Sequence, residues 1–364
     1  MSDLELIPAA RPLIGDEERA AVDAVLRSGM LAQGPEVAAF EREFSAALAD
    51  GRPTAAVNSG TSGLHLGLLA SGIGPGDEVI VPSFTFAATA NAVALAGATP
   101  VFADIERDTF NLDPESVRRA IGPRTAAIMP VHLYGHPADM HRLSALAAEY
   151  SLGLFEDAAQ AHAATIDGRP VGTFGDWAMF SLYPTKNMTS GEGGMVVSAE
   201  ADLDARVRLL RNQGMARPYE NEIAGFNARM TDLHAAIGRV QLGKLAGWTE
   251  QRRSNAARFD RELEGVIVPP VAGGAEHVYH QYTVRVTDDR DGFARALRDE
   301  YAIGTGVYYP TPVHRLPVFG LDLDLPETER AAAEALSLPV HPSLTEQDLD
   351  RIVAAVNALA KAGS

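Results

Sequence analysis

Short apolar runs alternate with amphipathic or alanine-rich segments through the first two thirds of the chain. Continuous apolar runs of this kind are typical of strands buried on both faces of a parallel sheet. We expect strands at residues 54–57, 77–82, 99–104, 125–131, 152–157, 177–182 and 193–198. Helices are expected at 61–72, 86–97, 113–121 and 138–150. The alternation predicts an α/β fold with a mostly parallel central sheet covered by helices on both faces.

The pattern changes after about residue 245. A long polar helix is expected over residues 247–265, an alternating strand over 280–286 and an amphipathic terminal helix over 345–362. A chain of 364 residues is longer than one ordinary hydrophobic core requires. We therefore expect a large domain over residues 1–245, which includes the N-terminal segment, and a smaller C-terminal α/β domain over residues 246–364.

Polar or glycine-bearing loops follow four of the predicted strands, at residues 58–63, 83–86, 156–162 and 183–187. Any one of them could be an ordinary polar turn. In open parallel sheets, however, ligands bind at the carboxyl ends of the strands. Four such loops with complementary chemistry predict one binding site at that edge of the sheet.

The composition restricts the kinds of partner and compartment. The formal net charge of -17 argues against nucleic acid or an anionic membrane surface as a partner, because such partners bind proteins with a positively charged surface. No apolar run approaches the ~20 residues needed to span a bilayer, and the first residues lack an apolar stretch of signal-peptide length. We therefore expect a cytoplasmic protein. The absence of cysteine excludes disulfides and thiol nucleophiles, and we expect no metal site.

Lys186 lies between the apolar run 177–182 and a cluster of glycines. Most lysines are surface residues, but a lysine in a cleft can form a Schiff base with pyridoxal 5'-phosphate (PLP). PLP enzymes also need a carboxylate at the ring nitrogen, and Asp157 directly follows an apolar run. Its alternative role is the N-cap of a following helix. We predict that Lys186 and Asp157 are the catalytic residues of a PLP site.

Other residues near these strand ends could hold the rest of the cofactor. A glycine-bearing turn that enters a helix suits a phosphate dianion, although such a turn usually only caps the helix. The predicted phosphate donors are Gly60, Thr61, Ser62 and Ser181. Phe86 is a candidate to stack on the ring, with core packing as the alternative. Gln160 could bond the ring hydroxyl or simply be solvated.

Taken together, the segments of the chain resemble the DegT/StrS type of PLP-dependent aminotransferases of fold type I, which act on nucleotide-linked keto-sugars. The resemblance covers roughly residues 10 to 360 and includes "VNSGTSGLHL", "VPSFTFAATANAVALAGATPVFADI", "EDAAQAHAA", "FSLYPTKNMTSGEGG", "GFNARMTDLHAAIGRVQL", "YHQYTVRV" and "YPTPVH". Such motifs in this order are highly specific, unlike any single glycine loop.

The resemblance implies a role for each candidate residue. Lys186 carries the Schiff base and then acts as acid and base, and Asp157 pairs with the ring nitrogen. Gln160 contacts the ring hydroxyl, and Phe86 stacks on the ring. The phosphate is held by Thr61, Ser62 and Ser181. Asn227, with Arg229 as the reserve candidate, reaches the phosphate of the partner subunit, so the active site would exist in a homodimer; a plain turn asparagine is the alternative.

The resemblance also suggests a substrate. The segment "TSGEGG" is similar to enzymes that aminate C4 of the sugar, so we expect a nucleotide-linked 4-keto-6-deoxy sugar as acceptor and glutamate as amino donor. The alternatives are a C3-keto-sugar, a cyclitol ketone, or a non-catalytic regulatory protein on the same fold. Candidate hydrogen-bond donors to the substrate are Tyr309, His314 and Arg315. The chain departs from the family at Tyr308, where histidine is frequent, and at His136, where glutamine is common.

Overall fold

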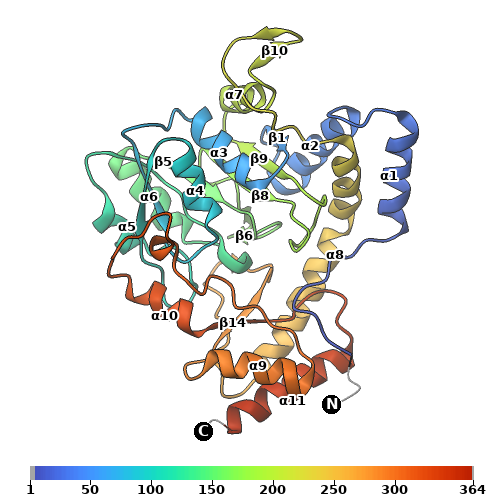
Figure 1. The fold of residues 1–364 in the computed structure, drawn as a ribbon, viewed down its shortest axis with the longest axis vertical. Helices are drawn as coiled ribbons and strands as arrows, with labels where there is room; N and C mark the ends of the chain where they lie inside the picture. Colours follow the sequence, from blue (N-terminus) through green and yellow to red (C-terminus); the bar gives the residue numbers. More distant parts are fainter. Residues whose placement is uncertain (1–4, 363–364) are drawn as a thin grey trace.

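A seven-stranded sheet forms the centre of the large part of the computed structural model, which describes residues 5–362 (Figure 1). The strand order is β1 (Thr54–Val57), β9 (Gly194–Ser198), β8 (Trp177–Ser181), β5 (Gly153–Asp157), β4 (Thr125–Ile128), β2 (Glu78–Pro82) and β3 (Thr99–Ala103). Only β9 runs antiparallel to its neighbours in this sheet. All seven predicted strands and the mostly parallel arrangement are confirmed.

Alternate residues of the strands pack on opposite layers of helices. Trp177 and Met179 of β8 lie in the core beneath α3 (Gly60–Ala70), α4 (Ala88–Leu95) and α7 (Ala201–Arg211). Phe180 lies on the other face, with Phe40 and Phe44 of α2 (Pro35–Leu48). Further along the sheet that second face is covered by α5 (Pro114–Ala120) and α6 (Met140–Tyr150). Burial on both faces explains why the strands read as continuous apolar runs.

The C-terminal part has its own core. It contains the antiparallel pair β13 (Tyr282–Arg285) and β14 (Ala335–Leu338), and the helices α9 (Arg290–Tyr301) and α11 (Glu346–Ala362). Phe259, Tyr282 and Ile352 pack together there. Ile7 joins this core through a parallel bridge to Ile303, so the N-terminal segment crosses to the C-terminal part.

A single long helix connects the two parts (Figure 1). The expected polar helix begins earlier than its polarity suggests, because α8 runs from Asp232 to Glu262 without a break. Thr231 caps it by accepting the backbone N–H of His234. The predicted domain boundary at residue 245 therefore falls inside a helix, and the division into 1–245 and 246–364 stays a prediction.

Smaller elements complete the structure. They are α1 (Asp16–Ser28), α10 (Pro326–Glu334), the 3-10 turns Leu133–Gly135 and Val313–Arg315, a small sheet of β12 (Ala275–Glu276), β6 (Thr165–Ile166) and β7 (Arg169–Pro170), and the hairpin of β10 (Met215–Arg217) and β11 (Glu220–Asn221). The hairpin projects at the top of Figure 1, far from α11 at the bottom. Across residues 5–362, no helix is long and apolar enough to cross a membrane, and no cluster of three potential metal ligands is present.

Candidate active site

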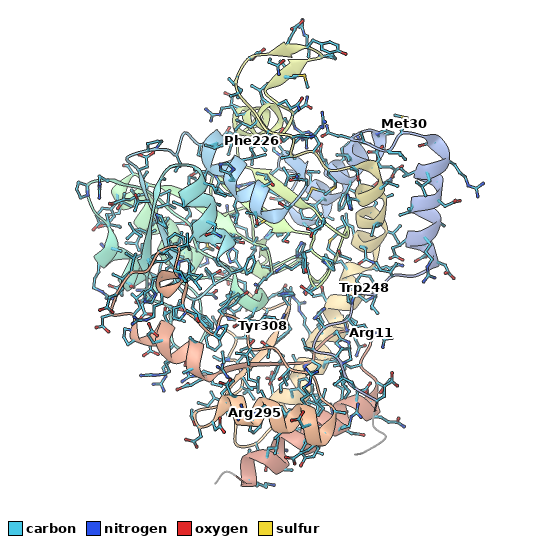
Figure 2. The ribbon with its side chains drawn as sticks, in the orientation of Figure 1. Arg11, Met30, Phe226, Trp248, Arg295 and Tyr308 are labelled. Carbon is cyan, nitrogen blue, oxygen red and sulfur yellow. The ribbon has the colours of Figure 1, made fainter. Side chains whose placement is uncertain are left out.

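A cavity of about 490 Å³ opens at the carboxyl ends of the central strands. Each of the four predicted loops contributes to its lining, as the sequence suggested. The contributing residues include Ser59, Gly60 and Thr61; Thr85 and Phe86; Asp157 and Gln160; and Tyr183 and Lys186. The C-terminal part closes another side with His280, Gln281, Tyr308 and Tyr309. In Figure 2, Tyr308 lies at the junction of the two parts of the molecule.

Asp157 is the last residue of β5 and is only 4% exposed. Its Oδ2 accepts a hydrogen bond from the Thr89 hydroxyl at 2.8 Å, and its Oδ1 accepts the Ala159 N–H at 3.2 Å. Burial raises the pKa of Asp157, and the hydrogen bond from Thr89 opposes the rise. The residues after Asp157 form turns, not a helix, so the alternative role as a helix cap is wrong.

Lys186 lies in the turn after β8, where its backbone N–H donates to the Tyr183 carbonyl at 3.0 Å. Its side chain lines the same cavity as Asp157. Burial lowers the pKa of Lys186 to about 8, while the Asp157 carboxylate acts in the opposite direction. A lysine of this kind is partly neutral near pH 8 and can act as a nucleophile or base. It is not the ordinary solvated surface lysine that was the alternative.

The start of α3 forms a cradle of small residues at the edge of the cavity. Ser59 is the N-cap, and its hydroxyl accepts the Ser62 N–H at 3.1 Å. A Cβ on Gly60 would lie 3.1 Å from Ser181 Cβ and 3.2 Å from Ser181 Oγ, so a larger residue would fill the cradle. Free N–H groups and the positive end of the helix favour an anion here. Ser62 is not among the lining residues, and its hydroxyl lies 2.9 Å from that of Ser59.

Gln160 is held in one orientation. Its Oε1 accepts the Tyr134 N–H at 2.6 Å, so its Nε2 is the group that donates to the Tyr309 hydroxyl at 2.8 Å. Tyr309 adopts a φ of 61°, an uncommon conformation for a bulky residue, and its ring stacks against that of Tyr134. Since an amide nitrogen carries two hydrogens, Gln160 keeps one donor for a ligand.

Phe86 is 63% exposed at the cavity wall. The alternative of core packing is therefore wrong for Phe86, whereas the neighbouring Phe84 is fully buried. An exposed ring in the cavity that Lys186 and Asp157 also line is free to cover one face of a planar ligand.

The remaining predicted residues lie outside the cavity lining. His314 is buried with its Nδ1 2.6 Å from the Ser83 hydroxyl, and Arg315 forms ion pairs with Glu329 and Asp322. Of the three predicted hydrogen-bond donors to the substrate, Tyr309 lines the cavity and the other two do not. Asn227 is exposed and does not line the cavity of its own chain.

Asn227 follows Phe226, which lies far from Tyr308 in Figure 2. Arg229, the reserve candidate, is also outside the lining and donates to the Asn212 side chain at 2.9 Å.

Several lining residues were not found from the sequence. Thr89, Tyr183, Glu192, His280 and Gln281 carry no local signal that separates them from other polar residues. The motif "YHQYTVRV" did contain His280 and Gln281.

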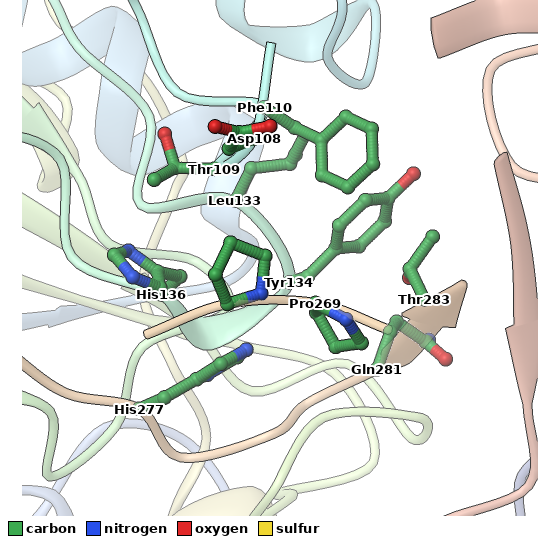
Figure 3. Close-up of a pocket in the computed structure, with 11 residues that line it drawn as sticks. Asp108, Thr109, Phe110, Leu133, Tyr134, His136, Pro269, His277, Gln281 and Thr283 are labelled. Carbon is green, nitrogen blue, oxygen red and sulfur yellow. The ribbon is translucent and has the colours of Figure 1, made fainter. Parts of the chain in front are cut away.

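A second cavity, of about 10 Å³, is bordered by Tyr134 (Figure 3). His136 and His277 line it, and Gln281 lines both cavities. This volume corresponds to about one water molecule, so it cannot hold a substrate. His136, a departure from the family pattern, therefore does not reach the main cavity: its Nδ1 donates to the Pro137 carbonyl and its Nε2 accepts the Ala272 N–H.

The chain is similar to known proteins over nearly its whole length. The sequence profile of the DegT/DnrJ/EryC1/StrS aminotransferase family matches residues 12–357. The chain belongs to this family. It is therefore an aminotransferase, and its architecture is that of the fold-type-I enzymes that the sequence resembled.

Individual relatives are similar over almost their whole length. The dTDP-3-amino-3,4,6-trideoxy-alpha-D-glucose transaminase of Streptomyces venezuelae is 42% identical, with 98% of this chain and 95% of that protein covered. GDP-perosamine synthase of Caulobacter vibrioides is also 42% identical, with 98% and 99% covered. The crystal structure of S. venezuelae DesV in complex with a ketimine intermediate has a TM-score of 0.92 at 40% identity, with 98% and 99% covered.

Proposed function

We propose that this aminotransferase uses PLP to convert a nucleotide-linked keto-sugar to the amino sugar. The observation that carries the proposal is the placement of Lys186, Asp157 and the Gly60 cradle around one cavity. A nucleophilic amine, a carboxylate and an anion site in one cavity match the three groups that PLP requires. The names of the relatives support a nucleotide-linked sugar as the acceptor.

The residues present fit the cofactor. Bound PLP supplies an aldehyde that exchanges between amines and a ring that accepts electron density from the carbon beside the amine. The phosphate would be held by Ser59, Gly60, Thr61 and Ser181. Asp157 would hold the ring nitrogen in its protonated form, and the free N–H of Gln160 would reach the ring hydroxyl. Phe86, exposed in the cavity wall, would cover one face of the ring.

Lys186 would perform the proton transfers. Its amine would take a proton from the α-carbon of the amino donor, for which we propose glutamate, and would deliver that proton to the carbon that the PLP aldehyde supplies. A base is most effective when its pKa lies near the working pH, and the pKa of Lys186 is about 8. Tyr308 and Tyr309 line the same cavity, and their hydroxyls would orient the sugar.

We propose C4 of the sugar as the aminated position, because the segment 189–194 reads "TSGEGG". The competing candidate is C3, which is favoured by a relative whose name places the amino group at position 3. The deciding experiment incubates the pyridoxamine-phosphate form of the protein with a panel of 3-keto and 4-keto nucleotide sugars. NMR of the product then locates the new amine. Failure of every keto-sugar, alongside turnover of a cyclitol ketone, would reject the nucleotide-sugar assignment.

We further propose a homodimer with shared active sites. Asn227 lies outside its own cavity, and its neighbours Phe226 and Ile223 are each 43% exposed. Exposed apolar side chains that gather in one patch mark a surface that another protein can cover. Asn227 would then donate to the phosphate bound by the partner.

A further inference from the structure

His280 lines the cavity that contains Lys186, yet the function proposed above gives it no task. It is buried, with 5% of its surface exposed. Its motif, "YHQYTVRV", marks the point where the chain passes from the large part into β13. What a buried histidine can do in a cavity wall depends on which of its ring nitrogens carries a proton and on which groups it faces.

The hydrogen bonds of Asn187 determine which ring nitrogen of His280 carries the proton. Asn187 Nδ2 donates to the Val278 carbonyl at 3.0 Å, which leaves Asn187 Oδ1 as an acceptor. His280 Nδ1 lies 3.3 Å from that Oδ1, so Nδ1 must be the donor. The other nitrogen, Nε2, is then an unprotonated acceptor as long as the ring is neutral.

Several contacts hold the ring in place through the backbone of its segment. Val278 N–H donates to the Gly135 carbonyl at 3.1 Å, and Gln281 N–H donates to the Tyr134 carbonyl at 3.1 Å. The buried guanidinium of Arg252 donates to the Tyr279 carbonyl at 3.1 Å. Tyr279 itself has a φ of 44°, a conformation that persists only where the surroundings enforce it. Such clamping is expected around a functional side chain rather than a loose loop.

The charges around His280 keep its ring neutral. Burial lowers its pKa well below the usual range, and Lys186, Arg252, His162 and His277 all act in the same direction. Asp157, on β5, faces Lys186 in the same cavity. Within residues 5–362, neither Lys186 Nζ nor His280 Nε2 is hydrogen-bonded to another residue. A donor and an acceptor without partners therefore share one cavity.

We propose that His280 is a positioning residue for Lys186, whose free amine donates a hydrogen bond to His280 Nε2 between the two halves of the reaction. The flexible stem of lysine lets the amine turn between the cofactor and this acceptor. The contact keeps the amine near the reacting carbon with a lone pair available for proton transfer. This inference rests on the proposed function, because Lys186 is released only if it holds the cofactor first.

Two substitutions of His280 test the contributions of its two ring nitrogens separately. His280→Asn keeps a donor where Nδ1 meets Asn187 but removes the acceptor at Nε2. His280→Gln can place its amide oxygen near the position of Nε2. The exposed His141, paired with Asp167, supplies the control His141→Asn. Because the sequence has three lysines, at 186, 244 and 361, chemical modification of Lys186 is easily distinguished from that of the other two by mass spectrometry.

The first measurement uses the cofactor-free protein. Competitive acetylation across a pH series, read by mass spectrometry, gives the pH midpoint of Lys186. Since a neutral acceptor stabilises the ammonium form, the midpoint should move to lower pH in His280→Asn and return toward the unmodified value in His280→Gln. An identical midpoint in all variants would overturn the proposal.

The second measurement uses the cofactor-loaded protein. In His280→Asn, kcat should fall about tenfold, the effect of losing about one hydrogen bond, while KM for the keto-sugar stays within about a factor of two. Partial recovery in His280→Gln is expected, and a loss confined to KM would overturn the positioning role. If the unmodified chain failed to bind PLP at Lys186, the proposed function would fall, while the acetylation result would still test the contact between His280 and Lys186.

Discussion

Gly60 and Ser181 touch so closely that a methyl group on residue 60 would come within 3.1 Å of the Ser181 Cβ. The two residues belong to α3 and β8, are 121 positions apart in the sequence, and both line the main cavity. The glycine is required there for space rather than for backbone conformation, because no positive φ occurs at this position. The contact makes the cradle sensitive to a single methyl group.

Gly60→Ala should weaken PLP binding by about tenfold or more, because the added methyl group would displace Ser181 from the proposed phosphate site, and a lost hydrogen bond to a charged group costs roughly 1.5–3 kcal/mol. The measurement is a spectroscopic titration of the cofactor-free protein with PLP. Gly247→Ala is the matched control, because a Cβ on Gly247 of α8 would meet nothing within 4 Å. Equal PLP affinity in both variants would contradict the phosphate site.

Lys186→Ala should abolish the visible absorption of covalently bound PLP and lower turnover by about 100- to 10,000-fold or more, the range for a lost proton-transfer group. Lys361→Ala removes an exposed lysine that pairs with Glu264, and it should change neither property. Absorption that persists in Lys186→Ala would place the covalent link at another amine.

Asp157→Asn should leave PLP bound but lower kcat by about 100-fold or more, because a neutral amide cannot stabilise the protonated ring nitrogen. In this variant the amide oxygen can keep the Ala159 N–H while the amide nitrogen donates to the Thr89 hydroxyl oxygen, so the thermal midpoint of unfolding should change little. Stopped-flow absorbance with glutamate measures the half reaction directly. Near-normal rates would contradict the pairing of Asp157 with the ring nitrogen. The exposed Asp167→Asn serves as the control.

The lowered pKa of Lys186 predicts how cofactor loading depends on pH. Only the neutral amine attacks the PLP aldehyde, so the loading rate should rise as pH increases toward about 8 and level off above it. A lysine with the ordinary pKa of about 10.4 would show a rate that is still rising above pH 9. The rate of absorbance change after mixing, followed between pH 6 and 10 at constant ionic strength, separates the two profiles.

Complementation tests whether Asn227 acts in the partner's site. Asn227→Ala alone should weaken phosphate binding by about 10- to 100-fold, the effect of one hydrogen bond to a charged group. If the sites are shared, mixed dimers of Lys186→Ala with Asn227→Ala contain one complete site and regain activity. A mixture that is no more active than Asn227→Ala by itself would place Asn227 in its own chain or outside the site.

The sequence by itself determined the sheet and the central pair of the site. Strands buried on both faces need continuous apolar runs, and these runs were visible for all seven strands. Asp157 ends one of the runs and Lys186 lies in the turn a few residues after another, and the carboxyl ends of parallel strands meet at one edge. Local pattern was therefore sufficient to bring these two residues together.

Only the tertiary structure decided which residues of the C-terminal part line the cavity. Gln160 meets Tyr309 across 149 positions, and His280 meets Asn187 across 93, while Asp104 caps α10 by accepting the N–H groups of Glu327 and Thr328. Conversely, His314 and Arg315 found partners away from the cavity. Hydrogen bonds between distant segments obey no local period, because they depend on how the C-terminal part docks on the sheet, and that docking is fixed by packing over the whole molecule.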